Sequence, residues 1–104
     1  MPVPQLDPEQ RRQALAKAAE ARRVRAELKQ MLKTGEVSLG EVLDRAGDGG
    51  HVAKMRVSEV IQAMPGYGRV KARRLMEELE IAGSRRLQGL GHRQRTRLLE
   101  EFEG

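Results

Sequence analysis

The stretch "PGYGRVK", residues 65–71, places two glycines at the start of a predicted helix, with cations directly after them. Gly66 and Gly68 permit a sharp chain reversal, because glycine adopts backbone angles that other residues avoid. The first amides of the following helix have no partner inside that helix, and the helix dipole adds partial positive charge there. These residues therefore predict the binding of a phosphate oxygen by backbone N–H groups.

A similar pattern recurs in "LQGLGHRQRTRLLEEF", where Gly89 and Gly91 stand 23 residues after the first pair. Each unit is predicted to be a short helix, a Gly-apolar-Gly hairpin and a longer helix. The residue between the glycines, Tyr67 in the first unit, is expected to plug into the core. The alternative is an exposed Tyr67 that stacks on a nucleobase.

Cations gather at the hairpin end of each long helix, and acids gather at the other end, in "EELE" and "EEFE". The helix dipole favours the opposite order, so we interpret the arrangement as phosphate binding rather than as a solvated face. Lys71 and Arg74 share a face at a spacing of three, Arg73 can lie on either edge, and Arg85 and Arg86 are expected to be exposed near the second turn. The candidate binding residues are Gly66, Gly68, Arg69, Lys71, Arg73, Arg74, Arg85, Arg86, Arg93 and Arg97.

Other chemistry has little support. The sequence has no Cys, and its two histidines, His51 and His92, stand far apart without a supporting carboxylate pattern, so we expect no metal site. It contains neither a phosphate loop with Gly-Lys-Ser/Thr nor a Cys nucleophile. We therefore expect no enzyme, no cofactor and no small-molecule substrate.

The length and net charge of the chain limit the kinds of partner that it can be expected to bind. The chain has 104 residues, enough for one small domain, and its net charge of +5 favours polyanions, with nucleic acid ahead of anionic membranes. The first helix has a mostly Ala apolar face, too weak for membrane insertion, and no segment looks like a signal peptide. We expect a cytoplasmic protein.

The elements that position the glycines are predicted to be all α-helical. Residues 1–7 form a flexible arm, 8–34 a long basic helix, and 35–104 a compact domain. Asp7 and Gln10 predict a capping box at the start of the long helix, which Gly35 ends. Its thin stripe of Ala predicts that the first turns either project from the body or lie loosely on it. The shorter helices begin after Ser38 and near Val57, Arg69 and His92; "GDGG", residues 47–50, is expected to be flexible, and Ser84 to cap a short turn through Leu87.

With these elements in place, "PGYGRVKARRLM" resembles the helix-hairpin-helix motif, with Ala72 at its small position and Leu75 and Met76 closing it. The tandem arrangement resembles a helix-two-turns-helix domain. The full chain resembles the integration host factors of actinobacteria, nucleoid-associated proteins that differ in fold from the HU-type factors. In the second unit Arg95 replaces the small Ala; this predicts a looser or differently angled turn and leaves open whether Gly89 and Gly91 hold a phosphate.

The resemblance implies a monomeric architectural protein of the nucleoid that binds duplex DNA through its backbone and bends or constrains it. Three points stay open from the residues. The same phosphate site would serve RNA or ribosome association, although a long basic C-terminal tail is missing. Pro2 stands where some helix-two-turns-helix glycosylases carry their nucleophile, but Val3 replaces their glutamate. The first helix either crosses DNA or is simply a solvated helix.

Overall fold

The computed structural model describes residues 7–103, and within them the chain is entirely helical apart from turns and one isolated β-bridge. The all-α prediction is confirmed. The predicted arm, apart from Asp7, and Pro2 lie outside the described residues. In chain order the elements are α1 (Pro8–Thr34), α2 (Leu39–Gly47), α3 (Gly50–Ala53), α4 (Val57–Ala63), α5 (Arg69–Glu78), the 3-10 turn η1 (Leu87–Gly89) and α6 (His92–Glu103).

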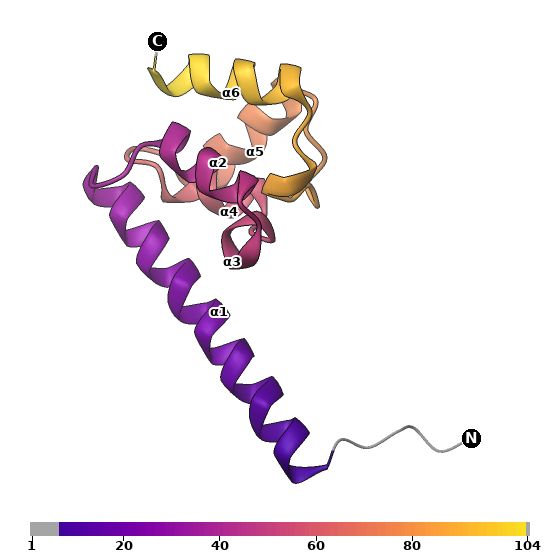
Figure 1. The fold of residues 1–104 in the computed structure, drawn as a ribbon. Coiled ribbons are helices and arrows are strands. Elements are labelled where there is room, and N and C mark those ends of the chain that lie inside the picture. The colour runs from indigo at the N-terminus through magenta and orange to yellow at the C-terminus, as the bar shows by residue number, and fades with distance from the viewer. Residues whose placement is uncertain (1–6, 104) are drawn as a thin grey trace.

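Helix α1 begins and ends as its local signals predict. The Gln10 N–H donates to Asp7 Oδ1 at 2.7 Å, and the Asp7 N–H donates to Gln10 Oε1 at 3.2 Å. Gly35 ends the helix with a φ of 80°. Residues 8–20 are all exposed, and only Leu28 and Leu32 are buried. The first turns of α1 therefore project from the body, as Figure 1 shows.

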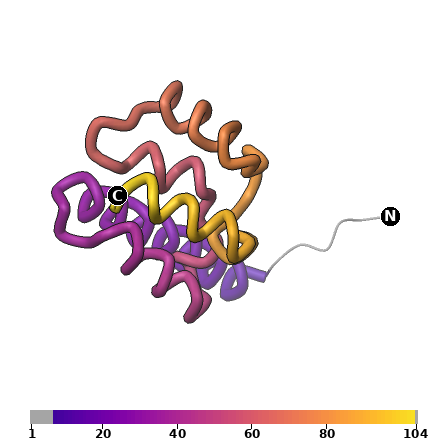
Figure 2. Tube along the Cα trace, turned by 90° about the horizontal axis from the view of Figure 1, so that it is seen from above, coloured from indigo at the N-terminus to yellow at the C-terminus, as the bar shows by residue number. Residues whose placement is uncertain are grey.

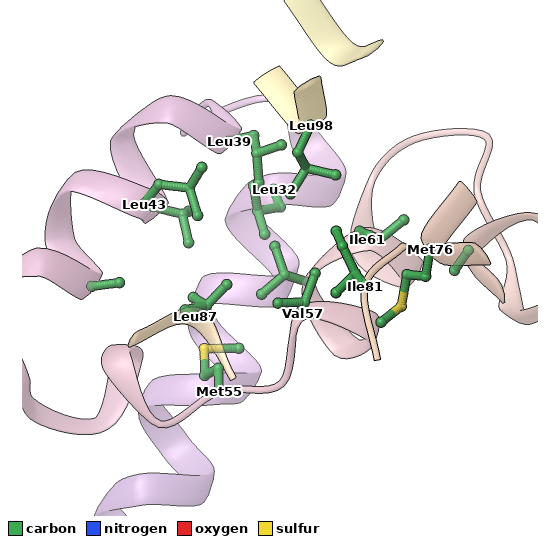
Figure 3. Close-up of a cluster of buried hydrophobic side chains, with 14 of the residues drawn as sticks. Leu32, Leu39, Leu43, Met55, Val57, Ile61, Met76, Ile81, Leu87 and Leu98 are labelled. Carbon is green, nitrogen blue, oxygen red and sulfur yellow. The ribbon is translucent and has the colours of Figure 1, made fainter. Parts of the chain in front are cut away.

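The body packs around aliphatic and Met side chains, because the chain has one Tyr, one Phe and no Trp. Ile61 of α4, Leu98 of α6 and Leu32 of α1 meet in this core, with exposed fractions of 0%, 0% and 1% (Figure 3). Burying one such side chain contributes about 1.5–3 kcal/mol. The last turns of α1 are thus anchored to the same core as the helices that carry the glycines.

The segment of residues 47–50 joins α2 to α3, which begins at Gly50, and its flexibility stays a prediction. A different local expectation is wrong. Ser84 caps nothing; η1 follows Arg86 and has no side-chain cap. Backbone hydrogen bonds instead hold the segment between α5 and η1 in place. The Val57 N–H donates to the Arg85 carbonyl, and the Leu87 N–H donates to the Met55 carbonyl, both at 2.9 Å.

The two glycine-containing turns lie at opposite ends of the body. We call residues 64–68 the first hairpin and residues 87–91 the second turn. Both views place the first hairpin at the left and the second turn at the right, with α5 and α6 running between the two ends (Figures 1 and 2). Because α6 starts at the second turn, its acidic C-terminal end returns to the first hairpin.

Candidate nucleic-acid interface

The first hairpin reverses the chain between α4 and α5. The Tyr67 N–H donates to the Met64 carbonyl at 3.0 Å, which closes the turn. Gly66 has a φ of 80°, a left-handed conformation that favours glycine. Gly68 is extended, with a φ of −121°, and a Cβ added there would meet no atom within 4 Å. Gly66 is required for its backbone angle, whereas Gly68 leaves open space at the N-terminus of α5.

The amides at this N-terminus are bare. The first helical bond runs from the Ala72 N–H to the Gly68 carbonyl at 3.0 Å, and no side chain caps the helix. Among the hydrogen bonds of residues 7–103, none uses the N–H of Arg69, Val70 or Lys71. Three parallel donors at the positive end of a helix dipole can hold one anion.

The other helix starts differ among themselves, since α1 and α2 have a side-chain cap whereas α3 and α4 have none. Asp7 caps α1, and Ser38 accepts from the Glu41 N–H at 3.1 Å at the start of α2. At the start of α6, the Gly91 N–H donates to Gln94 Oε1 at 3.0 Å. The glycine amide at the start of α6 is thus closed, whereas no hydrogen bond among residues 7–103 uses the N–H of Gly68. The next three amides of α6 lack a side-chain partner, as they do in α5.

Four predicted cations flank α5 on two sides. Arg69 and Arg73 line a groove of about 320 Å³ that α4 also walls. Lys71 and Arg74 line a hollow of about 200 Å³ on the other side, as their shared face predicted. The first turn of α5 contains no acidic residue. Cations thus lie on both flanks of α5, and the groove and the hollow each also contain glutamate: Glu77 in the first, and Glu78 and Glu101 in the second.

Tyr67 is half-buried and packs on α6. Its ring centroid lies 4.8 Å from that of Phe102, and its hydroxyl donates to Glu101 Oε1 at 3.4 Å, a long bond. Burial, then the negative charge and hydrogen bond of Glu101, and finally the charge of Glu78 raise the pKa of Tyr67. The predicted structural role of Tyr67 is confirmed, with α6 as the partner.

The remaining predicted cations lie toward the second turn. Arg85 is half-buried and donates from Nη1 to the Gly89 carbonyl at 2.8 Å, so the expectation that it is exposed is wrong. Arg86 is exposed, and its Nη1 donates to the Lys54 carbonyl. Arg93 and Arg97 are exposed on the first half of α6. The structure thus separates these four residues from the first hairpin.

The second turn differs in geometry, as the replacement of Ala by Arg95 predicted. Neither Gly89 nor Gly91 has a positive φ. Ala72 is buried at 1% exposure, a position that a guanidinium cannot take without a buried partner. Arg95 turns outward instead and pairs with Asp44 of α2 at 2.6 Å.

Two cations beside the first hairpin were outside the list of candidate binding residues, although they belong to the basic first helix whose contact with DNA the sequence left open. Lys29 and Lys33 of α1 line a groove of about 480 Å³ together with Gly66 and Tyr67. Lys29 also pairs with Glu59 of α4 at 3.0 Å. The sequence shows that the first helix is basic, but only the packing of α1 against α4 brings these two cations to the first hairpin.

Two other features are absent from the part of the chain that the structure describes. Residues 7–103 contain no cluster of His, Cys, Asp or Glu able to hold a metal ion. No described helix is long and apolar enough to cross a membrane.

Comparison with known proteins agrees with this architecture. A family model described as an S13-like H2TH domain matches residues 32–102. An integration host factor from Mycobacterium tuberculosis is 55% identical over 102 residues, covering 98% of this chain and 97% of that protein. The chain belongs to the integration host factor family.

Other members of this integration host factor family extend the likeness. The protein from Mycolicibacterium smegmatis is 54% identical over 103 residues, covering 99% of this chain and 98% of its own. The one from Streptomyces coelicolor is 47% identical over 102 residues, covering 98% and 95%. A solved structure of sIHF bound to an 8-base-pair palindromic DNA superposes with a TM-score of 0.82 at 45% identity, covering 84% of this chain and 98% of that one.

Proposed function

We propose that this protein is a nucleoid-associated architectural DNA-binding protein. It binds duplex DNA through the phosphate backbone with little sequence preference, and so constrains or bends it. The observation that carries the proposal is the bare N-terminus of α5 in the first hairpin, with cations on both flanks. Membership of the integration host factor family and the DNA complex of sIHF support it.

The chemistry of the site supports backbone binding. Amide donors and cations contact phosphates, which position a protein on DNA and carry no direct sequence information. The predicted ligands of this contact are Gly66, Gly68, Arg69, Lys71, Arg73 and Arg74. No catalytic step is part of the proposal, and the protein acts as a monomer within the nucleoid.

A second contact completes the proposed interface. Arg93 and Arg97 are exposed, while Arg85 and Arg86 donate to backbone carbonyls near the second turn. Because the second turn lies at the other end of the body, these cations contact phosphates distant from those at the first hairpin. Their contribution is electrostatic and depends on salt.

The test is the binding of a fluorescent random-sequence duplex across a salt series, with the wild type and Gly68→Asp. An Asp at this N-cap position reaches the bare amides and places a negative charge where the phosphate sits. We expect Gly68→Asp to lose about 100-fold in affinity, the effect of two lost bonds to a charged group. Its melting temperature does not fall, because Asp caps α5 and its Cβ meets no atom within 4 Å.

Three controls sharpen the result. Gly68→Asn caps the helix without the charge, so it separates blocked amides from repulsion. Gly91→Asp adds the same charge at the second turn and is expected to cost much less affinity. Duplex RNA serves as competitor, because phosphate-binding amides do not distinguish it from DNA. Normal binding by Gly68→Asp refutes the phosphate site, and stronger competition by RNA than by DNA favours an RNA partner.

A further inference from the structure

The fold creates an electrostatic conflict at the first hairpin. The hollow that contains Lys71 and Arg74 is also lined by Glu78 of α5 and Glu101 of α6. Glu101 comes from the acidic end of α6, which the antiparallel return of that helix brings here (Figure 2). A carboxylate so close to Lys71 can pair with its ammonium and neutralise it for DNA.

That pairing is not formed. Among the ion pairs of residues 7–103, none joins Lys71 to a carboxylate. The ammonium lies instead over the face of the Tyr67 ring, with Nζ 5.0 Å from the ring centroid. Glu101 accepts from the Tyr67 hydroxyl at 3.4 Å. One aromatic side chain thus contacts both charges.

The ring is itself held in place. Phe102 packs against it at an interplanar angle of 55°, with centroids 4.8 Å apart, a favourable aromatic geometry. A Lys side chain loses much rotamer entropy when it is fixed, so a rigid platform lowers the cost of holding its ammonium near a phosphate. The attraction between ring and cation supplies that restraint.

We propose that Tyr67 is a positioning residue for DNA binding. Its ring holds the Lys71 ammonium beside the bare amides of α5, and its hydroxyl occupies Glu101, which would otherwise pair with Lys71. The inference rests on the proposed DNA-binding function. Helix α6 contributes to the first hairpin through Phe102 and Glu101, although its acidic end is unsuited to touch DNA.

Burial and the charge of Glu101 support this role, because both raise the pKa of Tyr67 and keep its hydroxyl protonated as a donor. The second turn has Leu90 between its glycines, which offers neither an aromatic face nor a donor. The platform is therefore a device of the first hairpin alone.

The experiment is a double-mutant cycle of Tyr67→Leu and Lys71→Met, read as duplex affinity and as salt slope. Tyr67→Leu is expected to cost roughly two- to five-fold in affinity when Lys71 is present, the value of an exposed ring–cation contact. It is expected to change little when residue 71 is Met. Lys71→Met lowers the salt slope by about 1, and Tyr67→Leu lowers it in the same direction. Tyr67→Phe keeps the ring and most of the affinity.

Equal losses from Tyr67→Leu in both backgrounds overturn the inference, since a merely structural role does not depend on Lys71. The proposed function is judged separately: if the wild type fails to bind DNA, or Gly68→Asp binds normally, that proposal falls. If Gly68→Asp fails to bind and the cycle is additive, only the role of Tyr67 is wrong.

A second measurement uses the wild-type protein and so does not depend on whether a variant folds. By NMR, the ε-methylene protons of Lys71 are expected to be shifted upfield by the ring current of Tyr67, whereas those of Lys17, exposed in the projecting part of α1, are not. Ordinary shifts for Lys71 overturn the platform even where Tyr67→Leu loses its helix content and the cycle cannot be read.

Discussion

The first hairpin and the second turn share a spacing in sequence but not a geometry. Gly66 has a φ of 80°, whereas Gly89, 23 residues later, lies in a 3-10 turn without positive φ. The buried Ala72 lets α4 and α5 pack closely, and Arg95 at the corresponding place turns away to pair with Asp44. An internal repeat therefore predicted where two turns lie, and a single side chain decided that they differ.

The third residues of α5 and α6 also differ in a way that separates the two turns. Lys71 of the first unit corresponds to Gln94 of the second. Gln94 folds back, accepts from the Gly91 N–H at 3.0 Å and donates to the Glu80 carbonyl at 3.1 Å. A Lys ammonium has no acceptor atom, so Lys71 cannot close the first hairpin in this way. The glycine amide is therefore satisfied by a side chain in the second turn and not in the first hairpin, whereas the next three amides lack a side-chain cap in both.

The largest expected effect comes from making the first hairpin resemble the second. Lys71→Gln removes a charge and also allows the side chain to cap Gly68, whereas Lys71→Met removes only the charge. We expect a loss of about 10-fold in duplex affinity for Lys71→Met and a clearly greater loss for Lys71→Gln. Fluorescence titration at fixed salt measures both. If the two variants bind equally, closure by Gln94 is not what separates the turns.

The next effect concerns stability. Gly66→Ala forces a Cβ into a left-handed conformation, which we expect to cost about 1 kcal/mol and to lower the melting temperature by roughly 4–8 °C. Gly89→Ala adds a Cβ that would lie 3.3 Å from Arg85 Cδ, at the flexible part of a side chain, so we expect a change within about 0.5 kcal/mol. Thermal unfolding followed by circular dichroism compares them. Equal melting temperatures would contradict the assigned backbone difference.

The smallest expected effect is a shift in the titration of Tyr67, which Leu90 at the corresponding place of the second turn cannot show. Because the chain has a single Tyr, phenolate absorbance reports Tyr67 alone, and we expect its midpoint above the ordinary pKa of 10.0. Because the pKa of Tyr67 is raised in the folded state, its protonated hydroxyl contributes to the free energy of unfolding below the ordinary pKa. That contribution is lost as pH rises through the folded-state pKa.

A matched variant tests the causes of that shift. Glu101→Gln removes the nearby charge and should move the pKa of Tyr67 part of the way back, since burial remains the larger cause. An unchanged midpoint in this variant, measured by the same absorbance titration, means that Glu101 does not act on Tyr67. The contact between α6 and the first hairpin is then weaker than the structure indicates.

Local sequence signals correctly predicted several helix starts and stops. The capping box of Asp7 and Gln10, the stop at Gly35 and the cap at Ser38 lie where the sequence placed them. Each depends on residues within a few positions of one another, so the sequence contains the whole interaction. The error at Ser84 arose where distant segments meet, as in the pairing of Val57 with Arg85.

The amino-acid sequence by itself determined the helical elements, the two glycine pairs and the family, because these depend on spacing along one chain. Only the tertiary structure decided which charged side chains surround the first hairpin. It brought Lys29 and Lys33 of α1 to the first hairpin, and it set the acidic end of α6 against Tyr67. Such contacts depend on how helices pack around a shared core, and no local pattern records the direction in which a helix returns.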